Sequence, residues 1–220
     1  MLVLIGSTLK LSALEWGYIV LLLGLMTGSI YTDEDLKLNG FPGEGVTDGS
    51  VLVVKTHEWG DKARSYYRGV VLLVREPVDS ILSEFNRQNG GGHTGLARIS
   101  HFHKEGGKSW KNFLMTKLMK WEKMNLDWIN NFSGPQLLVS YNQLVTNPRE
   151  SLEQVLMFLE VTVDKESLEC TLASQEGVFR RKRRNISSLL DDHLHGLVNK
   201  SRQAVIQAFN KKSQKKINIL

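Results

Sequence analysis

The sequence predicts an α/β domain in which a central parallel sheet is flanked by helices. Short runs of Val and Leu alternate with amphipathic stretches along the chain, an order typical of strand–helix–strand units with right-handed crossovers. The 220 residues are 41% hydrophobic and 23% charged. This composition is sufficient for one buried core and is unlike that of a disordered chain.

Three apolar runs are predicted to be strands buried on both faces, because each is a continuous series of apolar residues rather than an alternating pattern. They are residues 51–55 (VLVVK), 70–74 (VVLLV) and 137–141 (LLVSY). The opening residues 1–5 (MLVLI) are predicted to form a fourth strand.

Four stretches with apolar residues at steps of three or four are predicted to be helices, because this spacing gathers the apolar side chains on one face. They are residues 77–87, 109–130, 148–160 and 191–212. Two of them open with proline, which suits the first position of a helix.

The apolar segment at residues 16–26 (WGYIVLLLGLM) is shorter than the ~20 residues that a membrane-spanning helix needs. We therefore expect a buried helix there, with a membrane anchor as the alternative. We accordingly divide the chain into an N-terminal segment with a strand and an apolar helix, residues 1–30, and a main domain, residues 31–220.

Charge is unevenly distributed along the chain, whose net charge is +5. Residues 180–220 hold 11 of the 28 Lys and Arg but only 2 of the 23 Asp and Glu. Such asymmetry predicts an anionic partner for this region, namely a phosphate, a nucleic acid or a membrane surface. For the lysines of residues 211–216 a solvated tail is the preferred interpretation.

Cysteine and sequon usage say little about the compartment. The single Cys170 excludes an intrachain disulfide and a thiolate metal cluster. Three N-x-S sequons, at Asn131, Asn185 and Asn199, agree with a glycosylated lumenal protein, although such sequons also arise by chance.

Each clear strand ends on a residue that suits an anion: Lys55, Arg75 and Tyr141. Ligands of parallel sheets bind at the carboxyl ends of the strands, and the planar fork of an arginine matches a phosphate group. An ion pair of Arg75 with Asp79 or Glu84 explains this residue equally well when it is taken alone.

The helix after Arg75 places Ser80, Ser83 and Arg87 on one polar face, while its apolar residues take the core side. The cluster at residues 179–184 (FRRKRR) then favours a ligand over an ion pair, since five consecutive cations need a polyanion or water. The glycine-rich residues 43–45 and 89–95 are predicted to be connectors, because neither stands between a strand and a helix as a phosphate loop does.

His57 is the best candidate for a general base, because an imidazole titrates near neutral pH. Glu58 is expected to act as a base itself or to hold the imidazole, and a purely structural histidine is the alternative. The sequence HFH, with His101 and His103, lacks the further ligand spacing of a metal site, so no metal is predicted.

Four segments together resemble the PAPS-dependent sulfotransferase superfamily, across residues 51–185 and in the same order. They are VVKTHE (53–58), VREPVDSILSEF (74–85), SYNQLVTNPRESLEQVLMFLEV (140–161) and EGVFRRKRRN (176–185). The details TGSIYTDEDLKLNGF, EFNRQ and EGVFRR are similar to the WSC-domain-containing sulfotransferases, which sulfate sialic acid hydroxyls as Golgi membrane proteins.

The resemblance implies a P-loop NTPase-like sulfotransferase fold and transfer of a sulfuryl group from PAPS to a carbohydrate hydroxyl, without a metal. His57 would be the base, with Lys55 stabilising charge and Glu58 beside it. The cofactor would be bound by five residues: Arg75, Ser83, Tyr141, Arg180 and Arg181. A carbohydrate acceptor in the Golgi would be the partner, with membrane attachment open and no nucleic acid.

One segment departs from the superfamily pattern. The loop that cradles the 5′-phosphosulfate should precede the helix at residues 16–26, but Gly6, Ser7, Thr8 and Lys10 match it poorly. The fold is therefore expected to be N-terminally incomplete. A non-catalytic protein that keeps the fold and binds PAP-type nucleotides, or serves as an interaction partner, is the alternative.

Two other classes share some of these features. A P-loop kinase needs a G-K-[ST] loop, which the sequence lacks. A nucleic-acid binder would interleave aromatic residues with its cations, whereas only Phe179 stands beside residues 180–184.

Overall fold

A computed structural model of the chain describes residues 2–6, 27–38, 42–91, 95–173 and 189–217. Their centre is a five-stranded parallel sheet in the order β2-β3-β1-β4-β5. The strands are β1 (Leu2–Gly6), β2 (Thr27–Ser29), β3 (Val53–Thr56), β4 (Gly69–Val74) and β5 (Gln136–Ser140).

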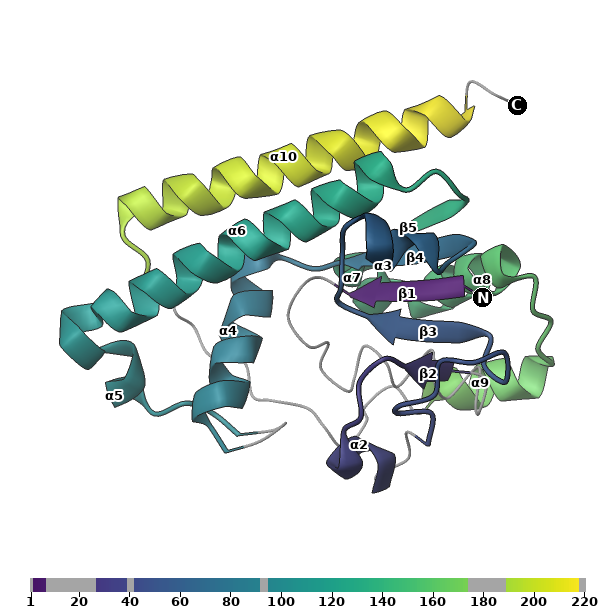
Figure 1. Cartoon of the computed structure of the whole chain (residues 1–220), viewed down its shortest axis with the longest axis horizontal. Helices are drawn as coiled ribbons and strands as arrows, with labels where there is room; N and C mark the ends of the chain where they lie inside the picture. Colours follow the sequence, from purple (N-terminus) through teal and green to yellow (C-terminus); the bar gives the residue numbers. More distant parts are fainter. Residues whose placement is uncertain (1, 7–26, 39–41, 92–94, 174–188, 218–220) are drawn as a thin grey trace.

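Helices cover both faces of this sheet (Figure 1). The longer ones are α4 (Pro77–Asn89), α6 (Lys108–Asn131), α8 (Pro148–Leu159), α9 (Lys165–Ala173) and α10 (Asp192–Ile217). The shorter ones are α2 (Glu34–Leu38), α3 (Asp61–Ser65), α5 (Ile99–Phe102), the 3₁₀ helix η2 (Lys104–Gly107) and α7 (Tyr141–Thr146).

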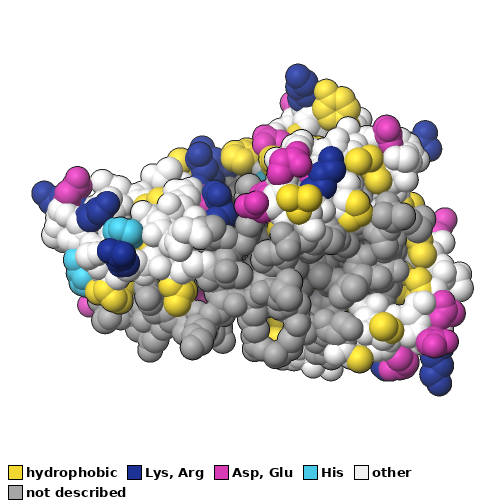
Figure 2. Space-filling model, turned by 90° about the horizontal axis from the view of Figure 1, so that it is seen from below, with side chains coloured by type: hydrophobic (Ala, Val, Ile, Leu, Met, Phe, Trp, Pro, Cys, Tyr) yellow, Lys and Arg dark blue, Asp and Glu magenta, His cyan; other side chains and the backbone are white. Residues whose placement is uncertain are grey.

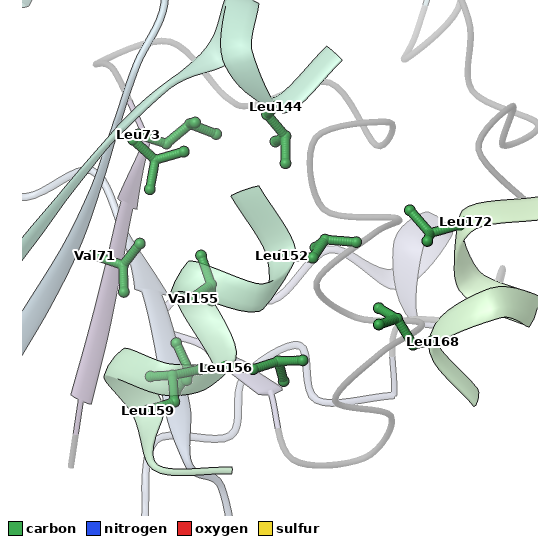
Figure 3. Close-up of a cluster of buried hydrophobic side chains, with 11 residues drawn as sticks. Val71, Leu73, Leu144, Leu152, Val155, Leu156, Leu159, Leu168 and Leu172 are labelled. Carbon is green, nitrogen blue, oxygen red and sulfur yellow. The ribbon is translucent and has the colours of Figure 1, made fainter. Parts of the chain in front are cut away.

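The strands alternate their side chains between two cores. Val71 and Leu73 point to a cluster that α7, α8 and α9 cover, where Leu152 and Leu172 are buried (Figure 3). The intervening residues of β4 point to the opposite core, which is formed by α6 and α10. That core contains Val70, Leu72, Trp121, Met124, Trp128, Ile129, Phe132 and Val205.

A third cluster lies beyond the sheet, where α4 and α5 pack on the first turns of α6 and α10. Phe85 of α4 is at its centre, with ring centroids 4.5 Å from Phe102 and 5.0 Å from Trp110. This packing fixes α4, which directly follows β4, against the long helix α6.

The predicted fold class agrees with this architecture, and so do the predicted strands and helices within a few residues. The segment MLVLI is β1, which pairs with both β3 and β4 at the centre of the sheet. One boundary was wrong: Tyr141 begins α7 instead of ending β5. The predicted apolar helix at residues 16–26 lies outside the described residues, as do most residues of the expected phosphosulfate loop.

Within the described ranges, no helix combines the length and the apolar character needed to cross a membrane. Acidic, basic and hydrophobic side chains are interspersed over the described part of the face in Figure 2. The basic cluster at residues 179–184 lies outside the described residues.

Candidate functional site

The predicted residues of β3 and β4 come together at the carboxyl edge of the sheet. Thr56 is paired with Ile5, and Leu73 with Gly6, so the two strands end on either side of β1. Since neighbouring strands lie about 4.8 Å apart, the ends of β3 and β4 are roughly 10 Å apart. His57 and Arg75 therefore flank the point at which the chain leaves β1.

His57 is held by Tyr31, a residue of the loop after β2. The backbone N–H of His57 donates to the Tyr31 hydroxyl at 2.9 Å. The two rings also stack, with centroids 5.5 Å apart and an angle of 26° between their planes. Tyr31 thus constrains both the backbone and the imidazole of the predicted base.

The hydroxyl of Tyr31 also donates to the Glu58 carboxylate at 3.5 Å. Burial raises the pKa of Tyr31 to about 12; the Glu58 charge adds to this, while the hydrogen bond from the His57 backbone opposes it. The phenol therefore stays protonated at neutral pH and serves as a donor. Glu58, which is exposed, is connected with His57 through this phenol.

Lys55 is buried and forms an ion pair with Glu44, with 3.5 Å between Nζ and Oε1. Both side chains are more than nine-tenths buried. Glu44 belongs to the glycine-rich residues 43–45, which we expected to be a simple connector. They instead pack against β2: Glu44 bridges Ser29, and a Cβ on Gly43 would lie 1.9 Å from the Thr27 carbonyl oxygen.

Arg75 and Tyr141 are neighbours at the ends of β4 and β5, because Val74 is paired with Ser140. The Arg75 guanidinium lies over the Tyr141 ring, 4.6 Å from its centroid. Such a cation–π contact uses the flat face of the guanidinium, whereas a phosphate is bound by the N–H groups in its plane. The arrangement is thus compatible with the predicted phosphate contact.

Ser83 lies on α4, less than two turns after its first residue, and is half-buried, whereas Ser80 is buried. Arg87 does not extend their polar face toward a ligand, because it binds Glu84 at 2.8 Å and 2.9 Å. Glu84 also accepts from Gln88 and lies 3.4 Å from Lys117.

The Glu84 carboxyl therefore contacts side chains of its own helix, α4, and of α6. Burial alone would raise its pKa, but the hydrogen bond and charge of Arg87, with Lys117 and Gln88, hold the pKa below its usual value.

Arg180 and Arg181 lie outside the described residues. His101 is half-buried and His103 exposed. Among the residues that the structure describes, no group of three or more His, Cys, Asp and Glu could hold a metal ion.

Tyr31 and Glu44 are the contacts of this site that sequence reasoning missed. Both follow or pair with β2, a strand of three residues, which is too short to show a periodic pattern. The only sequence signal was the segment TGSIYTDEDLKLNGF, which contains Tyr31 but carries no motif for a residue that supports a histidine.

Comparison with known proteins gives three findings. Residues 62–192 match the family described as "Sulfotransferase domain". The chain is 47% identical to a WSCD family member from Aedes aegypti over 161 residues, which are 73% of this chain and 50% of that protein. It is 46% identical to a WSCD family member from Drosophila pseudoobscura pseudoobscura over 164 residues, 74% of this chain and 52% of that protein.

The chain therefore spans about half the length of the curated relatives that it matches. Among solved structures, it resembles mouse sulfotransferase SULT7A1 complexed with PAP, with a TM-score of 0.50 and 13% identity. The likeness covers 97% of this chain and 84% of that one, and it shows a common fold.

Proposed function

Because the chain belongs to the sulfotransferase domain family, we propose that it transfers a sulfuryl group from PAPS to a hydroxyl group of a carbohydrate. One observation carries the proposal. A histidine held by a tyrosine and an arginine held over a tyrosine flank the end of the central strand. The β3 side would receive the acceptor, and the β4 side would bind the donor.

On the donor side, Arg75 and Ser83 would bind the 3′-phosphate of PAPS, with Tyr141 beside the adenine. Arg180 and Arg181 would complete the phosphate contacts, as the sequence predicts. Binding through a 3′-phosphate separates PAPS from ATP, which lacks this group. The solved structure with the same fold was crystallised with PAP, which supports this choice of nucleotide.

On the acceptor side, His57 would take the proton of the attacking hydroxyl. The acceptor oxygen forms a bond to sulfur while the bond between sulfur and the 5′-phosphate oxygen breaks, so PAP leaves as the second product. Transfers of this kind are loose and in line, so most of the catalysis lies in positioning and in charge stabilisation. Tyr31 supplies positioning, because it stacks on the imidazole of His57 and accepts a hydrogen bond from the backbone N–H of the same residue.

The acceptor and the compartment are part of the same proposal. Sialic acid hydroxyls are the first acceptors to test and the Golgi is the compartment, because the similar proteins are WSCD family members and the sequence resembles sulfotransferases of this kind.

A second function, nucleotide binding without catalysis, is favoured by the ion pair of Lys55. A lysine whose ammonium is held by the buried Glu44 carboxylate is less able to stabilise charge on a leaving phosphate. The chain would then bind PAP in the same place but transfer nothing.

Calorimetric titration of the purified chain with PAP tests the site. We expect Arg75→Ala to weaken PAP binding by at least about tenfold, since hydrogen bonds to a charged group contribute about 1.5–3 kcal/mol. Arg149→Ala is the matched control, because this arginine is exposed on α8 and binds Glu169. ATP should not bind.

Transfer of labelled sulfate from PAPS to sialylated glycans then separates the two functions. Transfer supports the enzyme, whereas PAP binding without transfer to any carbohydrate supports the non-catalytic alternative. A folded chain that does not bind PAP contradicts both.

A further inference from the structure

The long helix α6 presents buried tryptophans toward the loops of the candidate site. Trp121 and Trp128 are each no more than 1% exposed and belong to the core between α6 and the sheet. Their indole N–H groups nevertheless donate hydrogen bonds to backbone carbonyls of loops at the border of this core. Trp121 donates to the carbonyl of Arg75 at 3.1 Å, and Trp128 donates to the carbonyl of Glu58 at 3.0 Å.

Both carbonyls belong to the predicted site. One is the carbonyl of the predicted phosphate ligand itself, and the other follows His57 directly. Both carbonyls lie beyond the last residues of their strands, β4 and β3, so each indole ties a loop at the carboxyl edge of the sheet to α6. A buried indole N–H that loses its acceptor carries an energetic cost, which makes both hydrogen bonds selective for one backbone position.

Helix geometry fixes the distance between the two anchors. The tryptophans are seven residues apart, so they lie on one face of α6 and about 10.5 Å apart along its axis at 1.5 Å per residue. This separation cannot change without unwinding the helix. It therefore holds the Arg75 end and the His57 end of the site at a constant spacing.

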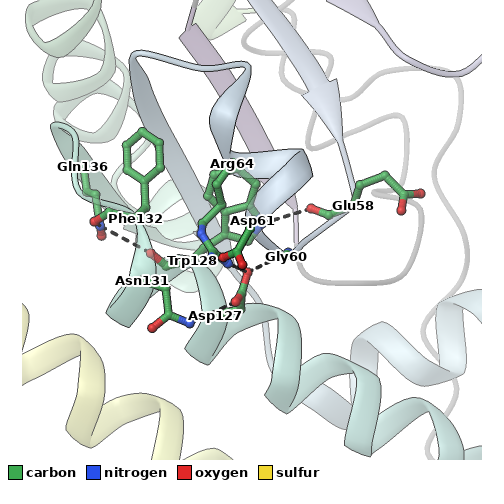
Figure 4. Close-up of polar contacts among 9 residues, drawn as sticks. All are labelled: Glu58, Gly60, Asp61, Arg64, Asp127, Trp128, Asn131, Phe132 and Gln136. Carbon is green, nitrogen blue, oxygen red and sulfur yellow. Dashed lines mark hydrogen bonds and ion pairs between the residues drawn. The ribbon is translucent and has the colours of Figure 1, made fainter.

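The anchor at the His57 end is reinforced by the neighbouring residue of α6 (Figure 4). Asp127 accepts from the backbone N–H of Gly60 at 2.8 Å and pairs with Arg64 of α3. Gly60 has φ 96°, a conformation that favours glycine. The chain between residues 58 and 60 is thus tied to α6 at both ends.

The anchor at the Arg75 end stands beside a cavity of about 240 Å³. Arg75, Trp121, Val205 and Phe209 line it, together with Glu76 and Arg202, which form an ion pair at 2.6 Å. The hydrogen bond from Trp121 to the Arg75 carbonyl therefore lies at the wall of this cavity.

We propose that Trp121 and Trp128 are positioning residues of the sulfotransferase site, with Trp121 setting the donor half and Trp128 the acceptor half. This inference rests on the proposed function. It predicts that removal of the indole N–H changes different kinetic constants at the two positions, KM for PAPS at Trp121 and kcat at Trp128. A purely structural role would give both variants the same loss of stability and no kinetic difference.

The test compares Trp121→Phe and Trp128→Phe with Met124→Ala. Met124 is fully buried on the same helix between the two tryptophans, so its truncation loosens the same core without removing a hydrogen bond to either loop. Binding of PAP, KM for PAPS and kcat with a saturating acceptor are measured for each variant, together with its unfolding midpoint.

We expect Trp121→Phe to weaken PAP binding and raise KM for PAPS about tenfold, a change of about 1.4 kcal/mol. Trp128→Phe should leave PAP binding close to that of Met124→Ala and lower kcat by about 10- to 100-fold, because a shift of about 1 Å at a reacting group has effects of this size.

Two results would overturn the proposal separately. If the wild-type chain binds PAP but both tryptophan variants behave like Met124→Ala, the positioning role is wrong and the proposed function stands. If the folded wild-type chain does not bind PAP, the proposed function and the inference fail together.

A measurement on the wild-type chain covers the case in which a variant does not fold. In ¹⁵N-labelled protein, PAP should shift the indole N–H resonance of Trp121 more than that of Trp128. Equal shifts or no shift would contradict the division of the site into two anchored halves.

Discussion

The buried ion pair between Glu44 and Lys55 leads to a quantitative prediction about stability. Their charged atoms are 3.5 Å apart, and the side chains are 5% and 8% exposed. At an effective dielectric constant of about 20, two unit charges at this distance attract each other by about 5 kcal/mol. Glu44→Ala removes the attraction but leaves the ammonium buried, so we expect a loss of about 3–5 kcal/mol in the free energy of unfolding.

The double variant Glu44→Met with Lys55→Met tests the reason for this loss. Because both charges are then absent and apolar groups of similar length replace them, its stability should return to within about 1–2 kcal/mol of the wild type. Urea unfolding followed by circular dichroism measures both differences. The exposed pair Arg149 and Glu169 is the control: its contact is shorter, at 2.7 Å, but Glu169→Ala should leave the unfolding midpoint unchanged because water screens it.

The reasoning is refuted if Glu44→Ala costs less than about 1 kcal/mol, the size expected of a solvated pair. It is also refuted if the double variant is no more stable than Glu44→Ala, since an unpaired buried charge would then not be the cause.

Three further predictions concern ionisation and anchoring. Burial raises the pKa of Tyr31 from 10.0 to about 12, so the unfolded chain loses the phenol proton at a lower pH than the folded chain. The free energy of unfolding should therefore fall between pH 10 and 12, by no more than about 2 kcal/mol after allowance for partial exposure. Tyr31→Phe should flatten this part of a plot of unfolding free energy against pH. Arg87 lowers the pKa of Glu84 against the effect of burial. The ionised carboxylate should therefore stabilise the fold above pH 4.5, and this part of the free energy of unfolding should be lost as the pH falls. Glu84→Gln should make the free energy of unfolding less dependent on pH in the acid range. Asp127→Ala should speed amide exchange at Gly60, measured by NMR, because the acceptor of its N–H is lost. Unchanged exchange would show that this hydrogen bond does not hold the loop.

Much of the fold could be predicted because its signals are local. Val70 to Leu73 are all buried, and a strand covered on both faces must be apolar at every position. The tryptophans and leucines of α6 recur at helical spacing for the same reason. The strand β2 and the helices α2 and α3 could not be found, because elements of three to five residues are too short for a period to appear.

Only those site residues that directly follow a predicted strand could be placed from the sequence. His57 and Arg75 could be placed at one edge because parallel strands end together, and the structure brings them to either side of β1. Tyr31 and Glu44 contact this edge from 26 and 11 residues away in sequence, and no local pattern encodes such contacts. The roles predicted for Lys55, Ser83 and Tyr141 remain predictions, although their positions are now known.

The tryptophans of α6 show why a core residue can matter for function in this fold. Trp110, Trp121 and Trp128 lie within the helix predicted at residues 109–130, and all three are buried, as residues of its apolar face should be. Each indole also donates to a carbonyl of a loop, since Trp110 binds Leu189 at 3.2 Å. A buried indole N–H needs a partner, and the loops at the carboxyl edge have carbonyls without one in the sheet. The same hydrogen bond therefore meets both needs, and it makes the position of the carboxyl edge of the sheet depend on how α6 packs. A substitution that removes the indole N–H of Trp121 or Trp128 should consequently change kinetics before it unfolds the protein.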